Sequence, residues 1–451
     1  MTSTPLALQR TLRRRWLIWA VLGVDNAMVN FQRVAPAVMA SDLMAAFQTS
    51  GTVLGALAAT YYYIYAAMQV PTGVLGDSLG PRPVATLGLF TSAAGSFLFA
   101  LAPSLWVAFA GRFLTGFGLA VVFTSSMRVF AEWFRPHEFV TVTGLTMTVA
   151  SFGGILAATP LSVLLSAIGW RASLALLGIL SIGLGIVTWL LVRDRPEQLG
   201  LPGVRTEAPL AAGRRLSVWQ GLRIVLRNRY TWPAFFAFFG YFGSLFTFLG
   251  LWGIPYLVQV YGISRTHASG YLILVNVGLI IGGPLQGLIA DRWLRRRKPP
   301  YFLSAAALTA IWAIFCFVNG GKPPLAWMGL LSFLFGLTTS ASIITHTMTT
   351  EVNPRQFAGI AIGVGNTAGF IGGAVLQVIM GMVLDRGWQG TLVEGVRIYP
   401  LEAYQAAFFL PLGAMLFSTV MALFTKETRC RNIYAELYPD PAPRAAAAGS
   451  S

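Results

Sequence analysis

Long apolar stretches follow one another along nearly the whole chain, with short polar or basic segments between them. Each stretch has about 20 or more mostly apolar residues, enough for an α-helix to cross the hydrocarbon core of a bilayer. Apolar residues fill the stretches without a period of two, which excludes membrane-spanning strands. The pattern predicts an all-α integral membrane protein with twelve transmembrane helices in two pseudo-symmetric six-helix halves. The expected spans are 16–41, 51–74, 82–102, 104–132, 141–167, 171–192, 231–259, 265–290, 300–319, 324–349, 357–384 and 402–425.

The composition agrees with a membrane location and narrows the expected partners. Hydrophobic residues make up 55% of the 451 residues and charged residues only 11%, whereas soluble proteins carry about 25% charged residues. The net charge of +16 is explained by anionic membrane lipids, so we expect no nucleic-acid partner. The two cysteines and three histidines form no metal-binding spacing, and we expect neither a metal nor a cofactor.

Basic residues indicate the orientation of the spans. If both termini are cytoplasmic, 24 of the 32 Lys and Arg residues fall in inner segments and five in outer loops, as the positive-inside rule requires. This predicts a multi-pass protein of a cell membrane, the inner membrane in bacteria. The expected parts are a cytoplasmic N-terminus (1–15), a bundle (16–192), a linker with an interfacial helix (193–230), a second bundle (231–425) and a disordered cytoplasmic tail (426–451).

A short polar signature follows the second apolar stretch of each half, displaced by the same 214 residues. The copies share a glycine, an aspartate four residues later and a basic residue; the positions are Gly73, Asp77, Gly80, Arg82, Gly287, Asp291 and Arg292. An aspartate here can hold a helix N-terminus or an arginine, so we expect both loops to act as gates that latch one conformation. The alternative is a simple positively charged loop.

These loops resemble those after helices 2 and 8 of the major facilitator superfamily. The segment Arg112–Gly118 is similar to the helix 4 motif of that family, while Phe31–Pro36, Trp252–Leu257 and Glu351–Pro354 resemble its anion:cation symporter and sugar-phosphate permease branch. The resemblance implies the major facilitator fold, with a substrate site near mid-membrane between two halves that rock around it.

Asn26, Asn30 and Arg33 lie on one face of the first expected helix because of their spacing. An arginine near mid-membrane costs about 2.5–3.5 kcal/mol, so it should face a partner or water. Its guanidinium can grip a carboxylate or phosphate through paired hydrogen bonds. We therefore predict that Arg33 binds an anionic substrate, as the resemblance also implies for this position. The alternative is a structural ion pair with Asp25.

The substrate is expected to carry a single negative charge. Phosphate-ester exchangers of the resembling branch use a second cation in helix 7, but residues 231–259 contain neither Lys nor Arg. A small carboxylate or zwitterion is therefore favoured over a phosphate ester. Further substrate contacts are expected from Tyr65, Gln69, His346 and Asn366, for which helix packing and interhelical hydrogen bonding are the alternatives.

Asp25 is the only carboxylate well inside an expected span, which makes it a candidate proton carrier. Its alternative role is that of a permanent partner of Arg33 or Arg112. The resemblance links Arg112 to proton coupling, while hydrogen bonding to backbone carbonyls of a neighbouring helix is the alternative for this arginine.

Taken together, these features predict a secondary active transporter for a small organic anion or zwitterion, working by alternating access and proton-coupled uptake, as a monomer in contact with membrane lipids. The alternative is a transporter-like receptor that senses an external organic anion or sugar phosphate without accumulating it. An enzyme is not expected, because no nucleophile, base or nucleotide-binding loop converges in the sequence.

Overall fold

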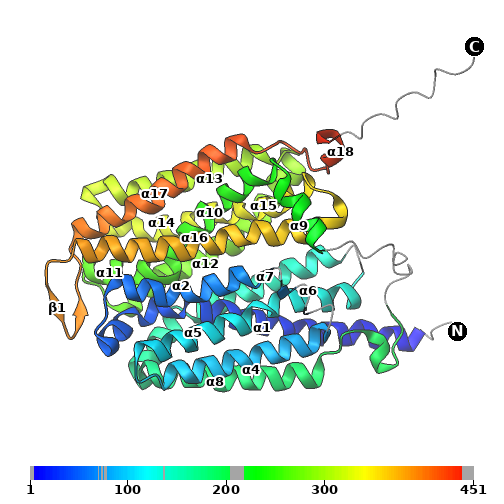
Figure 1. The fold of residues 1–451 in the computed structure, drawn as a ribbon, viewed down its shortest axis with the longest axis horizontal. Helices are drawn as coiled ribbons and strands as arrows, with labels where there is room; N and C mark the ends of the chain where they lie inside the picture. The colour runs from blue at the N-terminus through cyan, green and yellow to red at the C-terminus, as the bar shows by residue number, and fades with distance from the viewer. Residues whose placement is uncertain are drawn as a thin grey trace, which may run out of the picture.

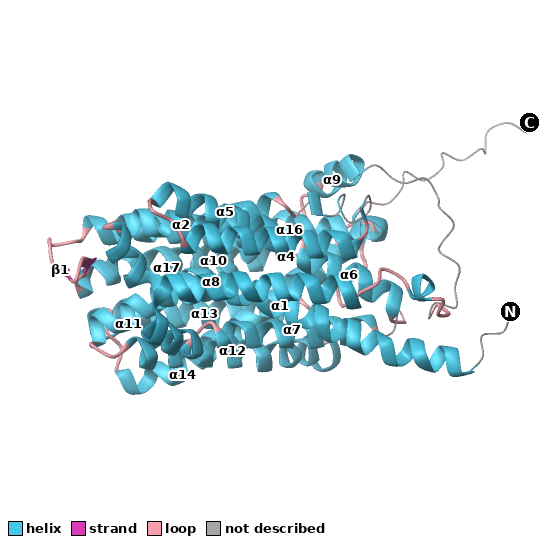
Figure 2. Cartoon of the chain, turned by 90° about the horizontal axis from the view of Figure 1, so that it is seen from below, coloured by secondary structure: helices cyan, strands magenta, loops and turns pink. Residues whose placement is uncertain are grey.

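The computed structural model describes residues 5–438 except 70, 73–74, 76–78, 136–137 and 204–217. The helices run along one long axis, with the first half of the chain on one side and the second half on the other (Figure 1). One end carries a two-stranded hairpin made of β1 (Leu392–Val393) and β2 (Val396–Arg397). We call this the hairpin end, and the opposite end, where α1 begins, the terminal end (Figure 2).

The first half is built from helices that run along the long axis in alternating directions (Figure 1). They are α1 (Pro5–Phe47), α2 (Gly51–Ala67), α4 (Pro81–Ala100), α5 (Leu105–Ala120), α6 (Val122–Trp133), α7 (Phe139–Leu156) and α8 (Thr159–Leu191). Gly169 breaks α8 with φ 76° and ψ 168°, a conformation that favours glycine. The first part of α8 therefore completes the fifth crossing, and the second part forms the sixth.

The second half repeats this arrangement. Its crossing elements are α10 (Thr231–Thr247), η2 (Phe248–Trp252), α11 (Gly253–Tyr261), α12 (Arg265–Leu288), η3 (Ile289–Trp293), α13 (Lys298–Phe317), α14 (Leu325–Thr339), η5 (Ser340–Ser342), α15 (Ile343–Glu351), α16 (Ala358–Arg386) and α17 (Leu401–Phe424). The short connecting elements are η1 (Pro196–Leu199), α9 (Val218–Arg227), η4 (Val318–Gly320), η6 (Arg355–Phe357) and α18 (Tyr434–Leu437).

Nine segments of the described chain are long and apolar enough to cross a membrane. One of them, Thr141–Leu191, contains two crossings because of the break at Gly169. Together with α1 and α2, these crossings make twelve, which confirms the predicted fold class.

The duplication is visible in how the helices approach one another. A Cβ atom on Gly153 of α7 would lie 1.9 Å from the carbonyl oxygen of Ala27 on α1. A Cβ atom on Gly372 of α16 would lie 2.2 Å from the carbonyl oxygen of Phe239 on α10. Each half thus brings its first and fifth crossing helices together at a glycine, which small residues make possible in membrane bundles.

The linker ends in the amphipathic helix α9 at the terminal end (Figure 1). Gly221 and Val225 are buried, with Val225 in a cluster that includes Phe357, whereas Trp219 is 76% exposed. An apolar body with an exposed tryptophan is typical of a helix at a membrane surface.

The tail needs a correction to the expected disorder. Residues 426–438 are ordered, because Asn432 donates hydrogen bonds of 2.9 and 2.8 Å to the carbonyl oxygens of Thr350 and Asn353. The amide of Ile433 donates a further bond of 2.8 Å to the carbonyl oxygen of Glu351. The remainder of the expected tail, from residue 439, lies outside the described residues.

Candidate functional site

Arg33 lies on α1 where the two halves meet. Its guanidinium is 5.2 Å from the ring centre of Tyr65 and 5.4 Å from those of Phe246 and Phe370. Tyr65 belongs to α2, while Phe246 and Phe370 belong to α10 and α16 of the other half. The arginine is half-buried, so part of it remains accessible between the halves.

The charge of Arg33 has little compensation from the protein. Its Nη1 donates a hydrogen bond of 3.2 Å to Asn30 Oδ1, and its buried Nε has no partner. Among the described residues, no carboxylate forms an ion pair with Arg33. Cation–π contacts contribute only about 0.5–2 kcal/mol each. Among the described residues, the guanidinium thus has aromatic rings and a neutral acceptor as neighbours, and no carboxylate as a counter-ion.

His346 and Asn366 form a second polar site in the other half. His346 Nε2 lies 2.5 Å from Asn366 Oδ1 and joins α15 to α16. The imidazole packs edge-on against Phe238, with ring centres 5.3 Å apart. Both His346 and Asn366 are half-buried, so they also keep accessible surface.

Two other predicted substrate contacts are not brought to this place by the structure. Asn26 is only 3% exposed and donates hydrogen bonds to the carbonyl oxygen of Leu22 at 2.7 Å and to Ser126 Oγ at 2.8 Å. Both hydrogen bonds of its side-chain amide group are therefore made to residues of the first half. Gln69 lies beyond the end of α2 toward the terminal end, where its carbonyl oxygen accepts a bond of 3.1 Å from Thr72 Oγ1.

Asp25 is fully buried between α1 and α8. Thr188 Oγ1 donates a hydrogen bond of 2.7 Å to its Oδ2, and its Oδ1 has no partner. Among the described residues, neither Arg33 nor Arg112 pairs with this carboxyl group. The two arginine partners considered from the sequence are thus replaced by a neutral hydroxyl.

Arg112 is 2% exposed and bonds to the backbone of α1. Its Nη1 donates a hydrogen bond of 2.8 Å to the carbonyl oxygen of Gln32, and its guanidinium lies 4.7 Å from the ring centre of Tyr61. Among the described residues, its buried Nε and Nη2 have no hydrogen-bond partner. The carbonyl contact is the one considered as the alternative to a coupling role.

At the hairpin end, Asp385 of α16 joins the two halves. It accepts hydrogen bonds from the amides of Gly51 at 2.9 Å and Thr52 at 2.7 Å, and from Thr52 Oγ1 at 2.6 Å. Tyr399 and Arg397 also donate to Asp385, at 2.8 and 3.3 Å. Burial and the neighbouring carboxylate raise the pKa of Tyr399, which keeps its hydroxyl protonated as a donor. We call these contacts the hairpin-end clasp; a carboxylate at the first turn of α2 is also favoured by the helix dipole.

Further bonds close the same end. Arg265 of α12 forms an ion pair of 2.6 Å with Asp42 of α1 and donates a bond of 2.8 Å to Ser41. The hydroxyl oxygens of Thr159 and Ser269 form a hydrogen bond of 2.9 Å, which again joins the two halves. Among pairs of described residues, all such hydrogen bonds between the halves lie toward the hairpin end. The bundle is therefore held closed at that end.

The first gating loop is only partly described, because Gly73 and Asp77 lie outside the described residues. Gly80 has φ 86° just before α4. The Arg82 amide donates a bond of 2.7 Å to Asp194 Oδ1, and its Nε donates one of 2.9 Å to the carbonyl oxygen of Trp189. The described part of this loop thus forms its hydrogen bonds within the first half.

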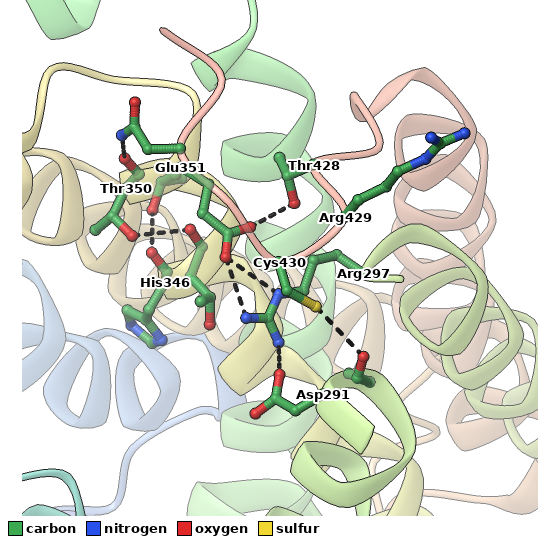
Figure 3. Close-up of polar contacts among 12 residues, drawn as sticks. Asp291, Arg297, His346, Thr350, Glu351, Thr428, Arg429 and Cys430 are labelled. Atoms are coloured by element: carbon green, nitrogen blue, oxygen red, sulfur yellow. Dashed lines mark hydrogen bonds and ion pairs between the residues drawn. The ribbon is translucent and has the colours of Figure 1, made fainter. Parts of the chain in front are cut away.

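In the second gating loop, Asp291 pairs with Arg297, which also contacts Glu351 at 3.1 Å (Figure 3). Glu351 in turn accepts a hydrogen bond from Thr428 of the tail. Burial acts to lower the pKa of Arg297, but the bonds and charges of Glu351 and Asp291 outweigh it and raise the pKa. Gly287 and Arg292 take no part in this network.

An acid that the sequence analysis missed follows the last helix of each half. Glu427 accepts hydrogen bonds from the amides of Arg297 at 2.9 Å and Lys298 at 3.1 Å, at the start of α13. In the same way, Asp194 accepts a hydrogen bond from the backbone amide of Arg82 at the start of α4. Each acid stands three residues after the final helix of its half. A search for acids repeated at that position in the two halves would have found both.

Replacing Glu427 by Gln should destabilise the protein by about 1 kcal/mol, the usual loss when a helix N-terminus loses a capping acceptor. An amide has one acceptor oxygen where the carboxylate has two, so one of the two amides, Arg297 or Lys298, loses its partner. The measurement is thermal unfolding in detergent. Glu436→Gln is the control, because Glu436 is 56% exposed and pairs with Arg431 at the surface. Equal melting temperatures for the two variants would contradict a capping role.

The two repeated six-helix halves define a membrane protein with the fold of a transporter. The Major Facilitator Superfamily model matches residues 20–377, so the chain belongs to this family. Its relatives include transporters for sulfoacetate and glycerol 3-phosphate, in keeping with the anion:cation symporter and sugar-phosphate permease branch that the sequence resembles. This confirms the resemblance found in the sequence.

Named relatives come from several bacteria. The protein named "Probable sulfoacetate transporter SauU" of Cupriavidus necator is 24% identical, over 84% of this chain and 89% of its own length. The glycerol-3-phosphate transporter of Bacillus subtilis is 28% identical, over 76% and 81% respectively. The membrane sensor protein UhpC of Escherichia coli is 25% identical, over 84% and 86%. The relatives thus include both transporters and a sensor.

Solved structures share the fold. A bacterial homologue of the human lysosomal transporter Spinster has a TM-score of 0.71 at 16% identity, covering 91% of this chain and 96% of its own. The D-xylose-proton symporter has a TM-score of 0.67 at 16% identity, covering 90% and 96%. At such identities the likeness shows the fold alone.

Proposed function

We propose that this protein carries a small organic anion with one carboxylate across the bacterial inner membrane by alternating access. The observation that carries the proposal is Arg33, a half-buried cation at the contact of the halves without an acidic partner among the described residues. A buried charge of this kind requires a counter-ion. The names of the relatives, which include anion transporters, support the same class of substrate.

In this proposal the terminal end faces the cytoplasm and the hairpin end faces outward. In this conformation the hairpin-end clasp closes the substrate site to the outside, so the site would exchange substrate with the cytoplasm. Opening outward requires the bonds of Asp385 and Arg265 to break. The loops around Arg82 and Asp291 then act at the cytoplasmic face, where latching contacts would favour the outward-open state.

A thermal-shift screen tests the substrate class. A ligand that binds the native protein raises its melting temperature with concentration. We expect monocarboxylates or zwitterionic amino acids to stabilise the purified protein more than glycerol 3-phosphate or other phosphate esters, since one central arginine matches one negative charge. Stabilisation by neutral compounds only would overturn the proposal, and stabilisation by phosphate esters alone would replace the carboxylate with a phosphate.

Proton coupling is assigned to Asp25, with Arg112 nearby in the same half. An isolated carboxylate in so buried a position is costly, and a single hydroxyl, that of Thr188, is its only hydrogen-bond donor among the described residues. Binding and release of a proton at Asp25 would therefore be tied to changes in the packing of α1 and α8.

Asp25→Asn should make uptake insensitive to an imposed pH gradient while leaving substrate exchange in place. The amide keeps the size of the side chain and its acceptor for Thr188 but carries no titrating proton. The measurement compares gradient-driven uptake with counterflow in proteoliposomes. Uptake by the variant that still responds to the gradient would show that the proton travels elsewhere, and loss of both activities would point to a structural role.

A sensor is the second candidate, because one relative is named a membrane sensor protein. Such a protein would bind the anion at Arg33 yet not accumulate it. Concentrative uptake distinguishes the two functions directly. In either case we propose a monomer in contact with membrane lipids through α9 and its exposed Trp219.

A further inference from the structure

A row of phenylalanine rings on α10 connects the two polar sites. Phe238, Phe242 and Phe246 follow one another at intervals of four residues, with ring centres 4.5 and 5.1 Å apart. Arg33 lies over Phe246 at one end of the row, and His346 packs on Phe238 at the other. A bound ligand that contacts both polar sites would therefore lie against these rings.

The middle ring is the one that keeps accessible surface. Phe238 is 1% exposed and Phe246 is 4% exposed, whereas Phe242 is half-buried. Arg33 and His346 are half-buried as well. Phe242 thus offers a flat apolar face between a cation and a hydrogen-bonding pair.

The same helix offers no free polar group to a ligand. The hydroxyl of Tyr241 donates to the carbonyl oxygen of Tyr301, that of Ser244 to the carbonyl oxygen of Tyr241, and that of Thr247 to the carbonyl oxygen of Gly243. A sugar or polyol placed along this helix would lose hydrogen bonds to water without replacing them. The surroundings instead match an apolar, flat ligand.

Building on the proposed function, we infer that the substrate is an aromatic monocarboxylate. Its carboxylate binds Arg33, its ring stacks on Phe242, and a hydroxyl or amino group on the far side of the ring bonds to the His346–Asn366 pair. Aromatic pairs prefer offset-stacked or edge-to-face geometry with ring centres 4.5–7 Å apart, which the row on α10 already adopts. Phe242 is then the residue that determines the specificity for a ring.

The experiment compares two carboxylates that differ in aromaticity, benzoate and cyclohexanecarboxylate, by calorimetric titration of the purified full chain. Benzoate should bind roughly two- to tenfold more tightly, the range expected for an aromatic pair beyond its buried area. 4-Hydroxybenzoate should bind more tightly still, and His346→Gln should reduce that extra affinity. Because the two carboxylates are compared on the unaltered chain, this result does not depend on how a variant folds.

Phe242→Leu should remove the preference for benzoate. Phe236→Leu is the matched control, because Phe236 lies on the same helix but is 37% exposed and packs on Phe417 of α17. The control should keep the preference seen in the parent. Equal preference in the two variants would show that Phe242 does not select the ring.

The outcomes separate this inference from the proposed function. If cyclohexanecarboxylate binds at least as tightly as benzoate and the binding depends on Arg33, the aromatic class is wrong while the proposed function stands. If no carboxylate binds in a way that depends on Arg33, both are wrong. Tighter binding of benzoate in the parent and the control, lost in Phe242→Leu, supports both.

Discussion

Arg33→Ala should abolish anion binding, with an affinity loss of at least about 100-fold. Hydrogen bonds to charged groups contribute about 1.5–3 kcal/mol each, and a guanidinium can form two with one carboxylate. Arg33 contacts aromatic rings and Asn30, while the nearby Arg112 is 2% exposed and bonded to the backbone of α1, so Arg112 does not replace it. Calorimetric titration with the best carboxylate of the thermal screen measures the loss.

Arg171→Ala serves as the control for this experiment. Arg171 lies near the hairpin end. Its guanidinium is 4.1 Å from the ring centre of Trp170, and its Nη2 donates a hydrogen bond to the carbonyl oxygen of Ala102. Its loss removes one positive charge without touching the central site. Arg33→Lys should retain part of the affinity, because an ammonium keeps the charge but not the paired geometry. Unchanged affinity in Arg33→Ala would make this arginine structural.

Asp385→Ala should open the hairpin end. The substitution removes five hydrogen bonds to one carboxylate, three of them from Gly51 and Thr52 across the halves. Even a part of the energy of such bonds, at about 1.5–3 kcal/mol each to a charged group, shifts a conformational equilibrium by tenfold or more. We therefore expect the variant to populate the outward-open state.

The opening is measurable as a distance between spin labels at Gln48 and Gln389, which are both exposed at the hairpin end. In Asp385→Ala the population at longer distances should grow. Glu402→Ala is the control, because this acid is exposed in the first turn of α17 at the same end. An unchanged distance distribution in Asp385→Ala would mean that the clasp does not hold the closed state.

The twelve helices and the duplication could be predicted because both follow from the length of apolar stretches and from one repeated loop. The position of Arg33 between the halves was predicted for a similar reason, since a cation in mid-span must face a partner or water. Tyr65 was expected at the same site, but the rings of Phe246 and Phe370 from the other half could not be predicted, because aromatic residues are frequent throughout this chain and nothing in the sequence selects these two.

The hairpin-end clasp was missed because its partners are far apart in sequence. Asp385 and Thr52 are separated by 333 residues, and an acid at the end of a span has no property that selects a distant helix N-terminus. The sequence suggested Arg33 or Arg112 as the partner of Asp25. In the fold, α8 packs beside Asp25, and Thr188 donates a hydrogen bond to its carboxyl group. Charge complementarity alone does not determine which helix packs against which.

The role of the first part of the tail was also hidden. Thr428 and Asn432 look like ordinary polar residues after a last helix, yet Thr428 donates a hydrogen bond to Glu351, the partner of Arg297, and Asn432 donates to the carbonyl oxygens of Thr350 and Asn353. The low complexity of the sequence after Pro439 suggested disorder, whereas Asn432 finds hydrogen-bond acceptors in the carbonyl oxygens of Thr350, in α15, and Asn353, just after it. Such pairing depends on the tertiary fold.

The most direct test of the central claim is concentrative uptake of the best carboxylate into proteoliposomes under an imposed proton gradient, with the parent and Arg33→Ala measured side by side. Our account predicts accumulation above the external concentration in the parent and none in Arg33→Ala. Saturable binding without accumulation in the parent would contradict transport and identify a sensor. Equal accumulation in both would contradict the role of Arg33.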